Sequence, residues 1–409
     1  MSDKILQEIQ SLQFLDNEAA NEKLKIFFSS FVPFDIDRVQ VRPLAVSLNS
    51  INGFLITKEG RKLFFKTHIE PESIVNEYYN SSILAEAGYP IIQPIYRSSQ
   101  WGKQLLIYDY FEYPSLFNIV WELENEPTSN IEKIARVQNE ADIYLWHLYQ
   151  KSLQTISPEE HSRSPIHQLF YHRLTGGRFQ QFYKNADIRL PGLSINYNDL
   201  CRFKWIINGR IFPDTLEDLV YRATQQLDPT NKKDILSIIG HGDAHNGNVF
   251  YEQTKDQLIY FDPAFAGRHS PFLDLTKPLF HNIFAIWMYY PVEIAKNLTI
   301  YWQIQSDTIE IQHNFAPSTL RLSFLQSKIE NVLKPLVELL QKNNELEEDW
   351  KEYLKSALFC CPFLTMNLGD SQKFSPEISL LGLAMSVEMG GFSPIDNLSI
   401  LDEALELGY

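Results

Sequence analysis

GHGDAHNGNVFYEQTKDQLIYFDPAFAG, residues 240–267, parses as a polar loop, a strand, a turn, a second strand and a second loop. A hairpin of this kind brings Asp243, Asn248 and Asp262 to neighbouring strand ends, so we expect their side-chain oxygens to converge. Magnesium takes oxygen ligands and keeps several waters, so a few side chains from the protein suffice to hold it. The stretch therefore predicts a magnesium site.

The spacing inside this stretch points to a reaction. Asp243 and Asn248 lie five residues apart, as in the D-x-x-x-x-N loop of phosphoryl-transfer enzymes. Asp262 follows at the end of the next strand, where a second metal-holding aspartate is expected. The order and spacing predict phosphoryl transfer rather than a polar loop over a core.

The combination HGDAHNGN, YFDPAFAG and PFLDL resembles the aminoglycoside phosphotransferase and fructosamine kinase-like family of small-molecule kinases, which are similar in fold to protein kinases. The resemblance implies that Asp243 is the catalytic aspartate and that Asn248 and Asp262 hold Mg2+. It also implies that His241, His245 and Asp274 support the loop. No second acid follows Asp262 at the position that many aminoglycoside enzymes use, so this segment is closer to the fructosamine kinase version.

The rest of the pattern predicts an α+β, protein-kinase-like fold of two lobes. Residues 1–38 are expected to form a helical N-terminal extension, and residues 39–112 a small antiparallel N-lobe. Its strands are predicted at 39–46, 54–60, 62–69, 91–96 and 104–111, with one helix over 71–88. Gly88 just past that helix is a common C-terminal signal. Residues 113–409 are expected to form a helical C-lobe, interrupted only by the stretch quoted above.

The N-lobe supplies the nucleotide-binding residues that the resemblance implies. Lys66 on the third strand would face the nucleotide phosphates, and Glu77 on the next helix would hold that lysine. The segment 47–54 would cover the phosphates, with Asn49 and Ser50 as donors, although it has the single glycine Gly53. Tyr110, Phe111 and Glu112 would form the hinge beside the adenine. The family uses ATP, and some members use GTP.

Composition limits the partners. The 409 residues are 44% hydrophobic, which suffices for buried cores, and 36 Lys and Arg against 51 Asp and Glu give a net charge of −15. This charge disfavours nucleic acid as a partner. Cys201, Cys360 and Cys361 indicate no disulfide framework, and the sequence shows no secretory signal or membrane span, so we expect a cytoplasmic protein.

The acceptor is expected to be a small molecule, because no APE-type segment follows Asp262. Acids in two regions would suit a cationic acceptor or would simply form solvated helix faces: Glu122, Glu124, Glu126, Asp402, Glu403 and Glu406. Two other functions stay open. One is a kinase-like protein that binds a nucleotide or partner without catalysis. The other is a metal-dependent phosphoesterase, disfavoured because Val249 rather than histidine follows the Gly-Asn pair. The sequence does not indicate an oligomeric state.

Overall fold

The computed structural model describes residues 2–42, 50–68, 80–98, 100, 102–126, 130–231 and 235–406. The chain forms two compact units. The first comprises Met1–Pro114 and Ile259–Ala264, and the second comprises Ser115–Leu258 and Phe265–Tyr409. The predicted boundary after residue 112 lies two residues before the division at Pro114. The sequence pattern did not predict that the segment 259–264 joins the first unit.

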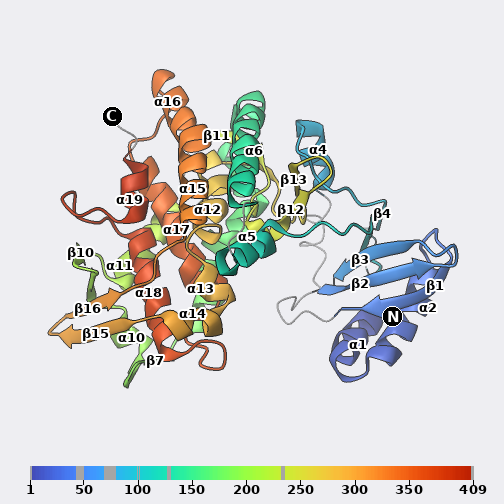
Figure 1. The fold of residues 1–409 in the computed structure, drawn as a ribbon, viewed down its shortest axis with the longest axis horizontal. Helices are drawn as coiled ribbons and strands as arrows, with labels where there is room; N and C mark the ends of the chain where they lie inside the picture. Colours follow the sequence, from blue (N-terminus) through green and yellow to red (C-terminus); the bar gives the residue numbers. More distant parts are fainter. Residues whose placement is uncertain are drawn as a thin grey trace. The chain divides into compact units, whose positions relative to one another are not determined.

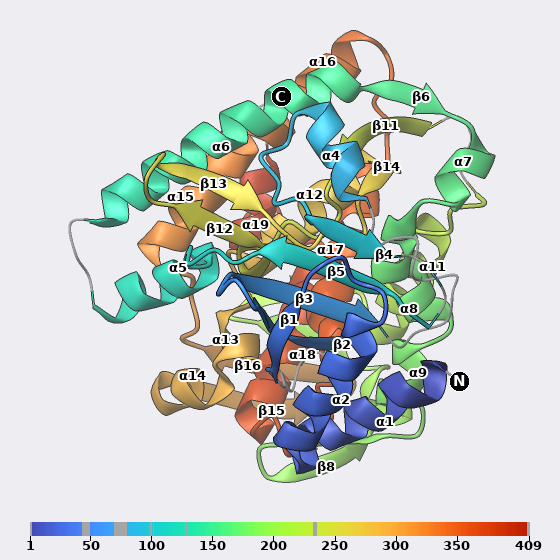
Figure 2. The same ribbon diagram turned by 90° about the vertical axis from the view of Figure 1, so that its right-hand side faces the viewer.

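The first unit is built on a five-stranded sheet of order β1-β2-β3-β5-β4, antiparallel throughout (Figures 1 and 2). Its strands are β1 (Ile36–Val41), β2 (Ser50–Thr57), β3 (Lys62–His68), β4 (Tyr96–Ser98) and β5 (Leu105–Asp109). Because side chains alternate along a strand, each of the central strands presents one set of residues to each face. The sheet therefore has two faces of different character.

Two helices cover one face of this sheet, α1 (Ser2–Leu15) and α2 (Asn17–Ser29). Asp16 caps α2 by accepting a hydrogen bond from the Ala19 N–H at 3.0 Å. Phe28 of α2 meets Phe65 of β3, with ring centroids 5.0 Å apart. Leu24, Phe28, Leu55 and Phe65 belong to one buried cluster. Residues 1–38, predicted as an extension, thus include two helices that complete the core of the first unit.

The strand β2 corrects one prediction. The segment 47–54 was expected to be a loop over the phosphates, but residues 50–54 lie in β2, and Gly53 pairs with Val41 and Phe65. A Cβ at Gly53 would lie 2.2 Å from the Gln40 carbonyl oxygen. Gly53 is therefore required by close strand packing. The helix α4 (Ser81–Ala87) ends at Gly88, whose φ is 106°.

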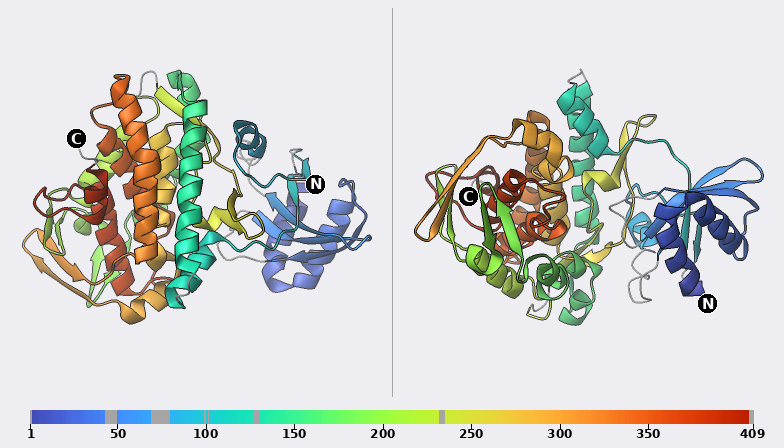
Figure 3. Two further views of the ribbon diagram at one scale, coloured as in Figure 1. Left: turned by 45° about the horizontal axis from the view of Figure 1, so that its top comes forward. Right: turned by 90° about the horizontal axis from the view of Figure 1, so that it is seen from below.

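The second unit is mainly helical. The helix α6 lies beside α15 and η4, and η4 continues into α16 (Figures 1 and 3). The helices are α5 (Leu116–Asn125), α6 (Asn130–Ser152), α7 (Pro158–Ser162), η2 (Pro165–Leu169), α8 (Tyr171–Thr175), α9 (Arg178–Tyr183), α10 (Tyr197–Leu200), α11 (Leu216–Gln226), η3 (Asn246–Asn248), α12 (Pro271–His281), α13 (Ile286–Tyr289), α14 (Pro291–Asn297), α15 (Thr319–Lys328), η4 (Ile329–Leu333), α16 (Lys334–Lys342), α17 (Trp350–Thr365), α18 (Pro376–Gly390) and α19 (Ile400–Leu405).

The second unit also contains strands that the sequence analysis did not predict. The hairpin β9 (Lys204–Ile207) and β10 (Arg210–Phe212) joins β15 (Ile300–Gln305) and β16 (Thr308–His313) in one sheet of order β10-β9-β16-β15. A separate pair consists of β7 (Asp187–Leu190) and β8 (Leu193–Asn196). The prediction of a helical lobe interrupted at one place was therefore wrong.

The stretch 240–267 contains β12 (Val249–Glu252) and β13 (Gln257–Tyr260), and it begins at the end of β11 (Ile235–Gly240) and ends at the start of β14 (Gly267–His269). β11 lies between β6 (Gln154–Ile156) and β14. The strands β12 and β13 follow as predicted strands. The helix α12 begins directly after β14, and every residue of α12 is buried. No helix among the described residues is long and apolar enough to cross a membrane.

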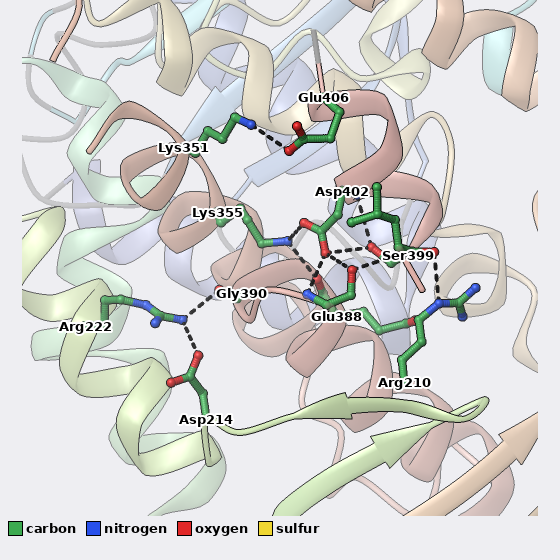
Figure 4. Close-up of polar contacts among 12 residues, drawn as sticks. Arg210, Asp214, Arg222, Lys351, Lys355, Glu388, Gly390, Ser399, Asp402 and Glu406 are labelled. Atoms are coloured by element: carbon green, nitrogen blue, oxygen red, sulfur yellow. Dashed lines mark hydrogen bonds and ion pairs between the residues drawn. The ribbon is translucent and has the colours of Figure 1, made fainter. Parts of the chain in front are cut away.

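A buried ion pair joins the C-terminal helices of the second unit (Figure 4). Lys355 of α17 bonds Asp402 of α19 and also donates to the Glu388 carbonyl of α18 at 3.3 Å. Asp402 further accepts hydrogen bonds from Ser393 and Ser399. These contacts fix three helices to one another through residues far apart in the sequence.

Candidate active site

Lys66 is the central residue of the candidate site in the first unit. It lies on β3 and pairs with Asn52 of β2 and Leu106 of β5. Its neighbour Phe65 faces the helices α1 and α2, so alternation along the strand turns Lys66 to the opposite face. The Lys66 Nζ donates to both carboxylate oxygens of Asp262, each at 2.7 Å. Two residues separated by 196 positions in the chain thus form one ion pair.

The short segment 259–264 holds Asp262 beside the sheet. The Tyr260 N–H donates to the Pro90 carbonyl at 2.8 Å, and the Ile92 N–H donates to the Tyr260 carbonyl at 3.0 Å. Asp262 has a φ of 57°, in the left-handed region. Aspartate tolerates this conformation better than most residues, and such strained positions are frequent at functional sites. The segment therefore fixes its carboxylate with a backbone that few other residues would adopt.

Aromatic rings surround Phe261, which precedes Asp262 in the chain. Phe261 lies with its ring centroid 5.0 Å from Tyr108, 6.1 Å from Phe64 and 6.0 Å from Phe111. The Lys62 ammonium lies over the Tyr110 ring, 3.8 Å from the ring centroid. Phe111 and Tyr110 are thus fixed by ring contacts within the first unit. Glu112 is exposed. The contact of residues 110–112 with a purine stays a prediction.

Two predicted nucleotide-binding residues, Asn49 and Glu77, lie outside the described residues. Ser50 begins β2, and its side chain is likewise outside the description. In the described part, the Lys66 partner is Asp262. The predicted pair of Lys66 with Glu77 is not tested.

The candidate catalytic loop lies in the second unit, after β11. The loop turns sharply at Gly242, whose φ is 78°, and a Cβ there would lie 2.6 Å from the Phe265 carbonyl oxygen. The Gly242 N–H donates to Asp274 at 2.6 Å. Glycine is needed at this position by both its backbone conformation and its close neighbour.

Asp274 fixes the loop from the buried start of α12. Its carboxylate accepts hydrogen bonds from the Gly242 N–H, from His269 at 2.9 Å and from the Tyr149 hydroxyl at 2.5 Å. Burial alone would raise the pKa of Asp274, but these hydrogen bonds and the nearby His269 outweigh it, so the pKa lies below its usual value. Asp274 is therefore an ionised anchor with three donors.

The loop histidines bond the backbone. His241 is fully buried, and its Nδ1 accepts from the Asp243 N–H at 3.3 Å. His245 precedes the short helix η3, and its Nδ1 accepts from the Gly247 N–H at 3.1 Å. The Asn246 N–H donates to the Asn282 side chain at 2.7 Å. Both histidines thus act on the loop conformation, and no described group of three or more His, Cys, Asp or Glu side chains could hold a metal ion.

Asp243 and Asn248 are held at fixed positions by this loop. The Asn248 amide nitrogen donates to the Asp243 carbonyl at 3.0 Å, which leaves the amide oxygen of Asn248 as the atom that a metal would use. Within the described residues, the Asp243 Oδ1 is buried without a hydrogen-bond partner, and the His245 Nε2 lies 3.9 Å from it. A buried carboxylate oxygen without a donor is costly, so this atom is ready to accept a proton or a hydrogen bond.

The donor set fits a hard cation. Asn248 offers an amide oxygen in the second unit, and Asp262 offers a carboxylate in the first unit that already binds one cation, the Lys66 ammonium. The predicted convergence of Asp262 with Asp243 and Asn248 stays a prediction, since the two units are described separately.

Three cations beside Asp243 were not predicted from the sequence. Arg173 is on α8, Arg178 begins α9 and Lys277 is on α12. The negative charge of Asp243 raises the pKa of each of them, against larger lowering effects of burial. The run YHRLTGGR, residues 171–178, carries two of them, but nothing in its spacing links it to a loop 65 residues later. Only folding of the chain brings these groups together.

Comparison with known proteins identifies similar solved structures of small-molecule phosphotransferases. A spectinomycin phosphotransferase in complex with ADP and spectinomycin is 13% identical, with a TM-score of 0.41, over 95% of this chain and 98% of that one. An aminoglycoside phosphotransferase is 10% identical, with a TM-score of 0.44, over 90% and 98%. An ethanolamine kinase from Plasmodium vivax is 12% identical, with a TM-score of 0.41, over 85% and 80%.

No family model matches this chain. No curated protein matches it either. The TM-scores of these structures are below 0.5. The function proposed below therefore rests on the residues of the two units and on their contacts.

Proposed function

We propose that the protein is an ATP- and Mg2+-dependent phosphotransferase that moves the γ-phosphoryl group to a hydroxyl of a small molecule. The observation that carries the proposal is the loop of residues 240–248, in which Asp243 keeps a buried carboxylate oxygen without a hydrogen bond and Asn248 is bonded to the Asp243 backbone. Phosphoryl transfer needs a fixed proton acceptor of this kind beside a metal-holding amide. The ion pair of Lys66 with Asp262 supports the same function.

Asp243 accepts the proton of the acceptor hydroxyl as that oxygen forms its new bond to phosphorus. The bond between the γ-phosphorus and the bridging oxygen breaks, and ADP leaves with the electron pair. General-base assistance contributes on the order of 10²–10⁴ to the rate. The hydrogen bond from Asp243 N–H to His241 and the anchor at Asp274 keep the carboxylate in place.

Lys66 would neutralise the nucleotide phosphates, and the oxygens of Asn248 and Asp262 would hold the metal. When bound, Mg2+ supplies positive charge to the phosphate oxygens and orients them. Because the Lys66 Nζ donates to both carboxylate oxygens of Asp262, the lysine orients the carboxylate for that role. Tyr110, Phe111 and Glu112 would line the purine, with ATP or GTP as donor.

The three cysteines are free and buried, in keeping with work in a reducing cytoplasm. Acceptors to be considered are amino sugars, amino alcohols, aminoglycoside-like antibiotics and related metabolites that carry a hydroxyl.

The test is turnover by two variants of the full chain. Wild type should add one phosphate to an acceptor only when ATP and Mg2+ are present, as measured by mass spectrometry. Asp243→Asn should lose activity by about 10³-fold while ATP still raises the melting temperature. Asp262→Asn, which tolerates the left-handed backbone, should lose the Mg2+-dependent part of that rise.

Two results would contradict the proposal. Equal turnover by wild type and Asp243→Asn would show that Asp243 is not the proton acceptor. Cleavage of a simple phosphomonoester without any ATP-dependent transfer would indicate a phosphoesterase instead.

A further inference from the structure

The surroundings of Asp243 in the second unit are positively charged. Arg173, Arg178 and Lys277 come from three different helices, and the negative charge of Asp243 raises the pKa of each. Contacts link Lys277 to Asp243: its Nζ bonds His281, whose ring centroid lies 5.5 Å from that of His245, and the His245 Nε2 lies 3.9 Å from the Asp243 Oδ1. Arg173 and Arg178 also repel one another. Like charges gathered around a single carboxylate are an unfavourable arrangement unless a further anion joins them.

Arg178 and Lys277 are held together by the end of α17. The Arg178 guanidinium donates to the Leu364 carbonyl at 3.1 Å and to the Thr365 carbonyl at 2.9 Å. The Lys277 Nζ lies 3.5 Å from the Thr365 hydroxyl. Both cations therefore contact the same residue, and neither is bonded to a carboxylate there.

The other hydrogen-bond partner of Lys277, His281, carries no negative charge. The Lys277 Nζ donates to the His281 Nε2 at 3.2 Å, and the Tyr289 hydroxyl lies 2.8 Å from the His281 Nδ1. Burial and the nearby Lys277 hold the pKa of His281 well below its usual value, so the ring is neutral at pH 7. This chain of contacts adds donors beside Asp243 but no counter-charge.

The guanidinium of Arg173 has N–H groups that no described residue accepts. Its side chain is half-buried, and it makes no hydrogen bond or ion pair with any residue in the part of the chain that the structure describes. Burial and Arg178 lower the pKa of Arg173 to about 10, which leaves the group charged at pH 7. A half-buried guanidinium without a partner is costly, and its planar donors match two oxygens of one oxyanion.

Three of the six acids that the sequence suggested for a cationic acceptor are bound by cations of the chain itself. Glu124 forms a two-pronged pair with Arg321, at 2.7 and 2.9 Å. Asp402 is bonded by Lys355, and Glu406 pairs with Lys351 at 2.9 Å (Figure 4). These carboxylates are therefore already neutralised, whereas the cations beside Asp243 are not.

We propose that the acceptor is a hydroxylated oxyanion, carrying a carboxylate or a phosphate group that Arg173 binds with Arg178 and Lys277 close by, while Asp243 holds its hydroxyl. This inference rests on the proposed function for the hydroxyl and the transfer, but the anion site exists independently of turnover. A cationic acceptor would instead meet three like charges. Carboxylate and phosphate acceptors both present oxyanion oxygens to Arg173, and the experiment distinguishes the two classes.

The experiment uses the full chain and matched compounds. D-gluconate and glycerol 3-phosphate represent the two oxyanions, and glucosamine, ethanolamine and spectinomycin represent amines. Binding is measured by isothermal titration, and ATP-dependent addition of phosphate by mass spectrometry. The variants are Arg173→Gln, the charge-conserving Arg173→Lys, and the control Arg163→Gln, which removes an exposed arginine paired with Glu159.

We expect at least one oxyanion to bind and to be phosphorylated, and the amines to do neither. Arg173→Gln should weaken oxyanion binding and raise the acceptor KM by about 10- to 100-fold, with the KM for ATP unchanged. Arg173→Lys should restore part of the affinity, and Arg163→Gln should behave as wild type. Thermal unfolding of each variant separates loss of binding from loss of the fold.

Three outcomes would overturn the inference: phosphorylation of the amines alone, failure of wild type to bind either oxyanion, or a rise in the ATP KM without a change for the acceptor in Arg173→Gln. The last result would assign the cations to the nucleotide phosphates. Binding that depends on Arg173 without any turnover would support the anion site and refute the phosphotransferase proposal, so the two can fail separately.

Discussion

At the scale of single residues, Asp274 links the catalytic loop to the core. Its carboxylate is buried and accepts hydrogen bonds from the loop backbone, a histidine and a tyrosine. Removing the charge leaves these donors with a weaker acceptor in a buried site. Asp274 is therefore where the stability of the loop should depend most directly on one charge.

Asp274→Asn should lower the free energy of unfolding by about 3 kcal/mol at neutral pH. Because the folded pKa lies below the unfolded one, the stabilisation is present above about pH 4 and is lost as the pH falls through the folded pKa. Urea unfolding at several pH values should show the wild-type and variant curves approaching each other in acid. The control Asp307→Asn changes an exposed carboxylate paired with Lys204 and should have little effect. A difference that is constant from about pH 6 to pH 3 would contradict the prediction.

The residues of the site were predictable from the sequence only where they are neighbours in it. The step from Asp243 to Asn248 is local, so its spacing is visible in the chain. Lys66 could be found because it lies on a strand with a clear pattern. The cation Arg173 could not be found, because its importance depends on the packing of α8 against distant helices, which no short pattern records.

At the scale of elements, Gly53 shows how closely the strands of the first sheet approach. Gly53→Ala places a methyl group 2.2 Å from the Gln40 carbonyl oxygen and 2.8 Å from the Phe65 ring. The backbone of β1 or β2 must shift, and we expect a loss of about 2 kcal/mol in stability. Hydrogen exchange should show faster opening of β1, β2 and β3. Gly60→Asn is the control, because Gly60 has open space around it and a φ of 82° that asparagine tolerates. Equal protection in both variants would show that the strands do not need this glycine.

Strands with a buried face were predicted well, whereas β9, β10, β15 and β16 of the second unit were not. Alternation marks β2 and β3, because one side faces the helices α1 and α2. The hairpin β9–β10 carried a signal that was missed: Asn208 and Gly209 have φ values of 50° and 77°, as an Asn-Gly turn requires. β15 is exposed along much of its length, so the contrast between its faces is weak, and β16 buries only Ile309 and Ile311. Their sheet depends on a parallel contact between β16 and β9, about 100 residues apart in the chain.

At the scale of the whole molecule, the C-terminal helices depend on the buried pair of Lys355 and Asp402. Lys355→Met should leave Asp402 buried without its cation and cost about 3–5 kcal/mol. Lys351→Met is a matched control on the same helix, since its partner Glu406 is exposed, and it should cost less than about 1 kcal/mol. Urea unfolding followed by circular dichroism measures both. Similar losses in the two variants would show that burial of the pair does not matter.

The first unit is assembled from two separate parts of the chain, residues 1–114 and 259–264. On the ribosome, Asp262 is made 196 residues after Lys66. At a synthesis rate of about 5–20 residues per second, this interval lasts roughly 10–40 s. During that time the sheet lacks Phe261 and Asp262, although residues 1–114 have already been synthesised. The nascent chain therefore lacks Asp262 as a partner for Lys66, and Phe261 as a neighbour of Tyr108, until about half of the second unit, residues 115–258, has also been synthesised.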